Sequence, residues 1–219
     1  MEQQKVFISV GGTATAQQED FVKLIEDRLR SENLIPSTIG RNNFSADSPL
    51  KAVKELMNEC SGILVIALER TFFEQGIEKR GGLQETNLSQ IKFATPWNQI
   101  ESGMAYGKGL PILVILENGI RAEGLLEKGY DWYVMTTALN QQSLTTSEFN
   151  GVLSSWKNKV EQYHINKTQA NAPSRINPGE LTIGELISNM KPAQLWGILA
   201  AFIAMMVGIF VIGQHFPAK

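Results

Sequence analysis

The sequence lacks several features that would point to a particular class of protein. Its single cysteine, Cys60, excludes a disulfide framework and suits a reducing compartment. The formal net charge is only −2, so no basic surface is available to neutralise the phosphates of a nucleic acid, and we expect no direct contact with one. The two histidines, His164 and His215, are distant from each other and from the cysteine. We therefore predict no metal site and no histidine-based catalytic triad.

The N-terminus and the surroundings of the cysteine are also informative. The N-terminal stretch MEQQKVFISV lacks the charged-then-apolar layout of a signal peptide, because its apolar run is only about five residues long. Cys60 lies within an amphipathic helical pattern, which favours a buried structural thiol over a reactive one. The lack of a signal peptide agrees with a cytoplasmic N-terminal domain.

Charge is absent from residues 192–214, where the sequence is most apolar. Residues 195–213 form an uninterrupted apolar run of 19 residues, which at 1.5 Å per residue nearly crosses a hydrocarbon core of about 30 Å. Trp196 lies at one edge of this run as an interfacial anchor. We predict a single transmembrane helix at 192–214, with a short tail at 215–219. The alternative is a buried helix of a soluble domain.

The flanks of this predicted span set its orientation. More lysine and arginine precede the span than follow it, which predicts a single-pass protein of the cell inner membrane with its N-terminal domain in the cytoplasm. Ala200, Ala204 and Gly208 recur every four residues within the span, a pattern that allows close helix approach and homo-oligomerisation. The alternative is the ordinary small-residue content of a membrane helix.

The remainder of the chain alternates short apolar runs with helical patterns. The predicted strands are 5–10, 34–39, 63–68, 110–116 and 131–135, and helical spacing or helix-start signals occupy most of the intervals between and after them. This pattern predicts an α/β domain over 1–164: a flavodoxin-like, five-stranded parallel sheet of order 2-1-3-4-5 with helices on both faces. Residues 69–94 have no clear period and are expected to form a long loop. Residues 165–191 are expected to be a linker with a short amphipathic juxtamembrane helix.

In such a sheet, ligands bind beyond the carboxyl ends of the strands, near the point where the strand order reverses. The candidate catalytic residue at this edge is Glu101, within the predicted helix that Thr95 and Pro96 begin. The candidate residues for binding a substrate or nucleotide are Ser9, Gly11, Gly12, Thr13, Glu69, Phe72, Trp97, Asn98 and Gly103.

Glu101 draws attention because it is a carboxylate in a helix that otherwise packs against the sheet. We expect the helix dipole to keep it ionised, by about 0.3–1 kcal/mol. Small neighbours such as Gly103 would let the helix approach the sheet and leave space for a flat ligand, and Trp97 and Phe72 would supply stacking faces. An ionised glutamate beside an N-glycosidic bond can attack the anomeric carbon or stabilise the oxocarbenium character that develops there.

Each candidate also has a simpler interpretation. Glu101 would then be a solvated helix residue, Trp97 a packing residue, and the run 11–13 a tight turn without a ligand. No Gly-Lys-Ser/Thr follows that turn, so it is not a P-loop.

The stretches KVFISV, SPLKAVKELMNECSGILVIAL and above all WNQIESGMAYGKGLPILVI resemble two related groups, over about residues 5–137. One is the Toll/interleukin-1 receptor (TIR) and TIR-like domains of bacterial anti-phage defence effectors; the other is the nucleoside 2-deoxyribosyltransferase-like proteins. The resemblance implies that Glu101 is catalytic, with Gly103 and Ala105 at the small positions after it. Asn98 resembles an asparagine often found three residues before the glutamate in TIR-like domains.

This sequence departs from the transferases at two places. The segment KFATPWNQ lacks their aspartate before the helix, and Val-Gly-Gly-Thr replaces their Gly-Pro after the first strand. These departures favour glycosidic hydrolysis, or nucleotide binding without catalysis, over base exchange.

Two functional readings follow from the resemblance. The first is a membrane-anchored TIR-like effector that cleaves the N-glycosidic bond of NAD or a related nucleotide in anti-phage defence, and that oligomerisation activates. NAD would be its substrate rather than a cofactor, no cofactor is expected, and an upstream sensor protein or a signalling nucleotide would trigger it. The alternative is a non-catalytic nucleotide sensor whose ligand drives oligomerisation of the span and membrane disruption. A third reading is a scaffold that recruits a partner through residues 69–94.

Overall fold

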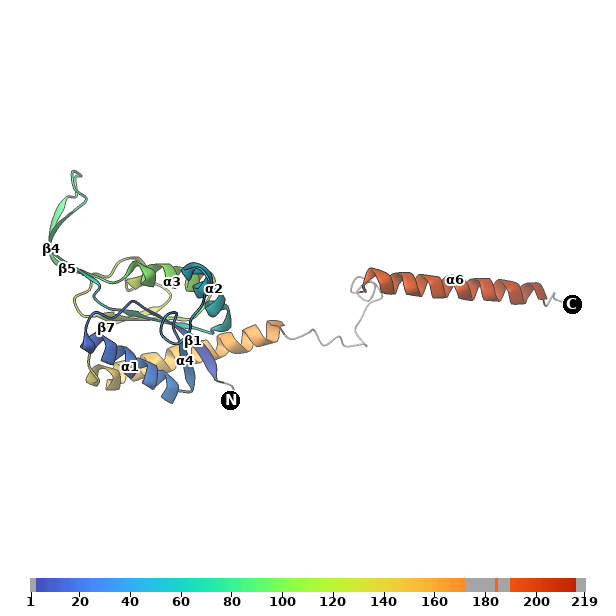
Figure 1. Cartoon of the computed structure of the whole chain (residues 1–219), viewed down its shortest axis with the longest axis horizontal. Coiled ribbons are helices and arrows are strands. Elements are labelled where there is room, and N and C mark those ends of the chain that lie inside the picture. The colour runs from blue at the N-terminus through green and yellow to red at the C-terminus, as the bar shows by residue number, and fades with distance from the viewer. Residues whose placement is uncertain (1–2, 172–183, 185–189, 216–219) are drawn as a thin grey trace. The chain divides into compact units, whose positions relative to one another are not determined.

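The structure is a computed structural model that describes residues 3–171, 184 and 190–215. The chain divides into two compact units, Met1–Asn171 and Ala172–Lys219. The first unit holds the α/β fold, and the second contains one long helix (Figure 1).

A five-stranded parallel sheet forms the centre of the first unit (Figure 1). Its strands are β1 (Gln4–Val10), β2 (Leu34–Ser37), β3 (Ile63–Ala67), β6 (Ile112–Glu117) and β7 (Tyr133–Thr137). The order is β2-β1-β3-β6-β7, and every neighbouring pair is parallel. The predicted α/β class and parallel sheet are confirmed. The strand numbers differ from the expected 2-1-3-4-5, because two strands of a separate hairpin intervene in the chain; the flavodoxin-like assignment stays a prediction.

Helices cover both faces of the sheet, as Figure 1 shows. One face carries α1 (Ala16–Ser31) and α4 (Ser147–Asn171), and the other carries α2 (Pro49–Glu59), α3 (Pro96–Gly107) and the short 3-10 helix η1 (Gly124–Leu126). A second 3-10 helix, η2 (Gln142–Thr145), precedes α4. Strand residues alternate between the two cores: Ile8 packs with α1 and α4, whereas Phe7 packs with α2. The central strands are buried on both faces, which explains their continuous apolar runs.

The helices begin where the capping residues predict. Pro49 and Pro96 each occupy the first turn of a helix. The hydroxyl of Thr146 accepts a hydrogen bond of 3.1 Å from the backbone N–H of Phe149 and so caps α4. This helix continues to Asn171, beyond residue 164, where the sequence analysis placed the end of the domain.

The prediction of a long loop at residues 69–94 is wrong, because most of this segment forms a β-hairpin. Strands β4 (Thr71–Glu78) and β5 (Thr86–Phe93) pair antiparallel as a separate two-stranded sheet that extends away from the α/β layers in Figure 1. Solvent reaches both of its faces, so the segment has no alternation of apolar and polar residues to reveal it.

The second unit contains α6 (Pro192–His215). Residues 192–210 of this helix have a mean hydropathy of 2.0 and are long and apolar enough, by length and composition, to cross a membrane. The predicted juxtamembrane amphipathic helix falls mainly on residues 172–183 and 185–189, outside the described residues.

Candidate functional site

The N-terminus of α3 places the candidate site at the carboxyl edge of the sheet. The hydroxyl of Thr95 accepts a hydrogen bond of 3.4 Å from the N–H of Trp97, and Pro96 occupies the first turn. The helix starts near the ends of β1 and β3, the two strands between which the chain reverses its direction across the sheet. Parallel α/β sheets bind ligands at this point.

Three buried polar residues meet between α3 and β1. The amide Nδ2 of Asn98 donates to the carbonyl oxygen of Ser9 at 3.1 Å and to its Oγ at 2.9 Å. Glu101 follows Asn98 by three residues on α3, and the Ser9 side chain lowers the pKa of its carboxyl. Ser9 and Asn98 are fully buried, and Glu101 is 9% exposed. The structure therefore brings together three of the predicted site residues. Ser9 and Asn98 are 89 positions apart in the chain.

The protonation state of Glu101 differs from the expectation. Burial raises its pKa from 4.5 to about 7, and the Ser9 side chain only partly opposes this rise. The helix dipole, which is expected to favour the ionised carboxyl, contributes at most about 1 kcal/mol at an exposed position. The loss of hydration on burial has a larger effect on the pKa of Glu101 than the helix dipole. Glu101 is therefore a group that gains and loses its proton near neutral pH.

The small residues of α3 do not all have the expected place. Ser102 and Ala105 are fully buried against the sheet side of the helix, which allows close approach. Gly103 is exposed, and a Cβ added to it would meet only Leu125, at an ordinary contact distance of 3.5 Å. The expectation that Gly103 brings the helix close to the sheet is wrong, because it lies on another side of α3.

The loop after β1 contacts the start of α3. A Cβ added to Gly11 would lie 2.9 Å from Cγ2 of Thr95, so only glycine fits there without displacing the helix N-terminus. The carbonyl oxygen of Gly12 accepts a hydrogen bond from Arg70 at 3.5 Å. Thr13 donates its hydroxyl hydrogen to Glu19 at 2.9 Å. Gly11 and Gly12 therefore lie at the predicted edge, while Thr13 is bound to α1.

Glu69 belongs to a network that ties strand ends together. Its carboxylate pairs with Lys92 at 2.6 Å, and its backbone N–H donates to Glu117 at 2.7 Å. The side-chain amide of Gln18 donates to the carbonyl oxygen of Glu69 at 3.0 Å and to Glu117 at 3.4 Å. These contacts join β3, β6, β5 and α1, so Glu69 already has structural partners.

Sequence reasoning missed the part that Gln18 and Lys92 play in this network. Gln18 is 4% exposed and lies on the same stripe of α1 as Phe21, Val22 and Ile25. The sequence signal for Gln18 is a polar residue at a position of the apolar stripe, where a buried side chain needs hydrogen-bond partners. Lys92 has no such signal, because residues 69–94 show no periodic pattern that would predict the hairpin.

The two predicted stacking residues have different surroundings. Trp97 is 40% exposed and precedes Glu101 by four residues, so the two side chains lie on one side of α3. Phe72 pairs with Lys92 across the hairpin and is 46% exposed. Its neighbour Phe73 contacts Phe93 edge-to-face, with ring centroids 6.0 Å apart. Successive residues of a strand point to opposite faces, so Phe72 and Phe73 lie on opposite faces of the hairpin.

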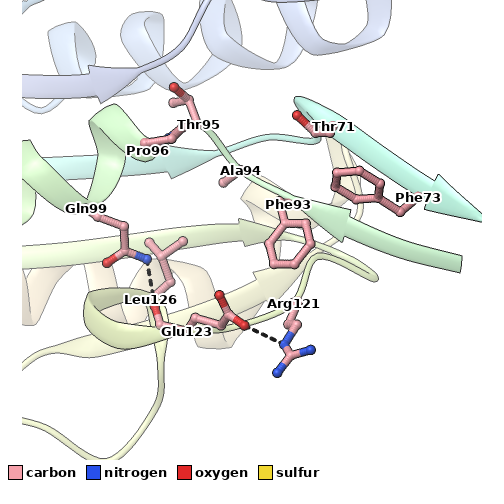
Figure 2. A pocket seen from close by; sticks show the side chains of 10 residues that line it. All are labelled: Thr71, Phe73, Phe93, Ala94, Thr95, Pro96, Gln99, Arg121, Glu123 and Leu126. Carbon is pink, nitrogen blue, oxygen red and sulfur yellow. Dashed lines mark hydrogen bonds and ion pairs between the residues drawn. The ribbon is translucent and has the colours of Figure 1, made fainter. Parts of the chain in front are cut away.

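A cavity of about 320 Å³ lies at the base of this hairpin (Figure 2). It is lined by Thr71, Phe73, Phe93, Ala94, Thr95, Pro96, Gln99, Arg121, Glu123 and Leu126. Arg121 is held by Glu78 at 2.5 Å and by Glu123 at 2.6 Å. The amide of Gln99 donates to the carbonyl oxygen of Glu123 at 2.7 Å and accepts from the N–H of Leu125 at 3.0 Å.

This cavity is separate from Glu101. None of the predicted site residues lines it, and Phe73 lines it where Phe72 was expected to supply a ring. Gln99 and Glu101 are two positions apart on α3, which turns their side chains to nearly opposite sides of the helix. The fold thus presents two features around the N-terminus of α3: a buried carboxyl beside β1, and an aromatic cavity beside the hairpin.

Within residues 3–171, 184 and 190–215, no three His, Cys, Asp or Glu side chains lie close enough together to hold a metal ion.

Comparisons with known proteins identify no family. No protein-family profile matches the chain, and no curated protein matches it. Among solved structures, the CMP N-glycosidase BcmB of Clostridium botulinum is similar, with a TM-score of 0.30 and 20% sequence identity over 52% of this chain and 72% of that chain. A similarity at this level establishes neither a family nor an activity, so the site is interpreted from its own geometry.

Proposed function

We propose that this protein cleaves the N-glycosidic bond of a nucleotide, NAD or a related compound, with Glu101 as the catalytic carboxyl. The observation that carries this proposal is the position of Glu101: a buried carboxyl on α3 near the switch point of a parallel sheet, whose pKa burial raises to about 7. A structural residue at this position would be better replaced by an apolar one, since burial of a carboxyl opposes folding.

The chemistry requires a negative charge close to the sugar. As the bond between C1′ and the base nitrogen breaks, its electron pair leaves with the base and positive charge develops on the ribose. The ionised Glu101 stabilises that charge, or bonds to C1′, and does so strongly because the site is poorly hydrated. Water then supplies the hydroxyl group at C1′ and releases one proton. Trp97, on the same side of α3, offers a ring face for the base.

The assay for this proposal measures the free base released from NAD and related nucleotides by the purified full-length protein in membranes. Glu101→Gln should abolish release, because the amide has nearly the same shape but cannot become negative. Glu55→Gln makes the same chemical change at an exposed position of α2 and should leave release unchanged. Full activity of Glu101→Gln would refute the assignment.

We further propose that the protein acts at the inner membrane, anchored by residues 192–214 with the α/β unit in the cytoplasm, and that homo-oligomerisation activates it as an anti-phage effector. The length and composition of α6 support the anchor. An upstream sensor protein or a signalling nucleotide would then set the degree of assembly.

A second candidate function rests on the cavity beside the hairpin. It forms without Glu101, and its two phenylalanine rings and its Arg121 suit a flat ligand with polar edges. In this case the α/β unit is a non-catalytic nucleotide sensor, and ligand binding drives assembly of the membrane helix and disruption of the membrane.

Removal of residues 190–219 separates the two candidates. An enzyme keeps some base release when its α/β unit is clustered artificially, whereas a membrane-acting sensor loses its toxicity. Entry of a dye into cells that retain normal NAD would favour the sensor.

A further inference from the structure

The charges around the cavity beside the hairpin do not balance. Arg121 is the single cationic residue that lines it in the described part of the chain. Its Nε lies 2.6 Å from Oε1 of Glu123, which also lines the cavity, and its Nη2 contacts the carboxylate of Glu78 at the end of β4. Figure 2 shows the carboxylate of Glu123 directed at this guanidinium. Two carboxylates therefore share one positive charge, and the group as a whole is negative.

An arginine bound in this way is a poor partner for a phosphate. Arginine recognises phosphate through its planar fork of N–H groups, and here the fork already donates to carboxylates from two segments of the chain. A phosphate would have to displace Glu78 or Glu123, and the displaced carboxylate would stay close enough to repel it. The remaining N–H groups of Arg121 can still donate to the polar edge of a flat ligand.

The N-terminus of α3 also borders the cavity, and helix N-termini commonly attract anions. Its first donors are already used. Pro96 has no N–H, the N–H of Trp97 donates to the hydroxyl of Thr95 at 3.4 Å, and that of Asn98 donates to the carbonyl oxygen of Thr95 at 3.1 Å. The helix dipole itself corresponds to about half a positive charge. That is less than the carboxylate charge that Arg121 leaves uncompensated.

Two other cations at the base of the hairpin are directed elsewhere. Lys92 pairs with Glu69 at 2.6 Å and precedes Phe93 in the strand, so it lies on the opposite face of the hairpin from the ring that lines the cavity. Arg70 donates to the carbonyl oxygen of Gly12, in the loop after β1. Neither cation lines the cavity, so neither cancels its excess negative charge.

The apolar part of the cavity suits a flat group. The rings of Phe73 and Phe93 line it, with centroids 6.0 Å apart and planes at 77° to each other. The face of a phenylalanine ring carries partial negative charge and attracts a cation. The side-chain amide of Gln99 is occupied by the backbone of Glu123 and Leu125, so it holds the wall in place. Ring faces next to carboxylates are favourable surroundings for a planar cation.

We propose that the cavity beside the hairpin binds a flat, positively charged group, such as a cationic ring or an amidinium, and disfavours phosphate. This inference rests on the second proposed function, because it takes the cavity to be a ligand site, and it does not depend on Glu101. A nucleotide held here enters with a cationic base, and its phosphates stay outside the cavity.

The test uses three flat probes of nearly equal shape: benzamidine, which is a cation at neutral pH, benzamide, which is uncharged, and benzoate, which is an anion. Ligand-observed NMR titration of the full-length protein in non-ionic detergent micelles measures their dissociation constants. Benzamidine should bind about fivefold more tightly than benzamide, the size of a cation–π contact at an exposed site, and benzoate more weakly than both. Added salt should reduce the preference, because it screens the carboxylates.

Glu123→Gln removes one carboxylate, keeps nearly the same shape, and should remove the preference for benzamidine. Glu74→Gln is the matched control, because it makes the same change at an exposed residue of the same hairpin. Glu74 follows Phe73, so it lies on the opposite face and outside the cavity lining, and the preference should persist. If Glu123→Gln fails to fold, Glu78→Gln removes the other carboxylate at Arg121 and decides in its place.

Equal affinities for the three probes, or tightest binding by benzoate, would overturn the inference, as would an unchanged preference in both Glu123→Gln and Glu78→Gln. A preference for benzoate would refute the charge assignment and still leave the cavity as a ligand site. Failure of every probe to bind would refute the inference and the sensor together. Base release that depends on Glu101 is measured separately and decides the enzyme, whichever of these results is found.

Discussion

At Glu101, the requirements of folding and of chemistry oppose each other. The carboxyl is 9% exposed and faces Ser9, while its ionised form loses most of its hydration. Burial of an ionised carboxyl opposes folding, and this effect on stability can be measured.

Between pH 4.5 and 7, the free energy of unfolding should depend on pH through Glu101, whereas Glu19 and Glu32, whose pKa values are lowered, act at lower pH. Its pKa is about 7 in the folded protein and near 4.5 in the unfolded chain, so between these values the folded state keeps a proton that the unfolded state has lost. Stability therefore falls as pH rises from 4.5 to 7, by up to about 3 kcal/mol. Glu101→Gln does not titrate and should exceed the wild type in stability by about that amount at pH 8, but not at pH 4.5.

Denaturant unfolding of the α/β unit, followed by tryptophan fluorescence across this pH range, measures the difference. Glu55→Gln should follow the wild-type curve. Equal pH dependence in Glu101→Gln and wild type would show that the carboxyl is hydrated.

The thiol of Cys60 should be unreactive in the folded state. The thiol is fully buried, as the sequence predicted, and burial raises its pKa to about 12, so almost no thiolate forms at neutral pH. We expect labelling by a thiol reagent to proceed at the rate of unfolding and to accelerate in denaturant. Rapid labelling of the native protein would contradict the buried position.

At the scale of elements, Gly62 tests how α4 packs on the sheet. A Cβ at this position would lie 2.5 Å from Cγ2 of Val160 and 3.3 Å from Cζ2 of Trp156. Gly62→Ala should lower the free energy of unfolding by about 1–3 kcal/mol, because the helix must move. Gly151→Ala, within α4 and free of neighbours within 4 Å, should raise it by about 1 kcal/mol through helix propensity. Thermal unfolding of the two variants compares these opposite effects.

The hairpin provides an element-scale test of the sensor reading. Phe73 lines the cavity, whereas Phe72, which is exposed to a similar extent, does not. If the cavity binds a nucleotide, Phe73→Ala should weaken binding about tenfold or more, and Phe72→Ala should leave it unchanged. Calorimetry with NAD as the probe measures both. Equal affinities of the two variants would remove the cavity from consideration.

The limits of sequence reasoning are also clearest at this scale. Strands buried on both faces were predictable, since β3 and β6 are apolar without interruption. The hairpin was not, because its two strands pair mainly with each other and face solvent, so no periodic pattern marks them. At the site, Glu101 was predicted from its place near the start of a helix, and Asn98 from the resemblance to TIR-like domains. The contact of Asn98 with Ser9 was not, since it depends on how α3 lies against β1.

At the scale of the whole molecule, the proposed membrane anchor is α6. Deletion of residues 192–215 should move the protein from the membrane fraction to the soluble fraction, because no other described helix is long and apolar enough to cross a bilayer. Carbonate extraction of cells expressing the full-length and truncated chains gives the answer. A full-length protein that carbonate releases would not be an integral membrane protein.

The central claim is that Glu101 breaks an N-glycosidic bond, and the most direct measurement is the content of NAD and related nucleotides in cells that express the protein. We predict that the wild type and Glu55→Gln deplete one of these pools and release its free base, while Glu101→Gln, expressed to the same level, leaves every pool intact. Depletion by Glu101→Gln equal to that by the wild type would contradict the account.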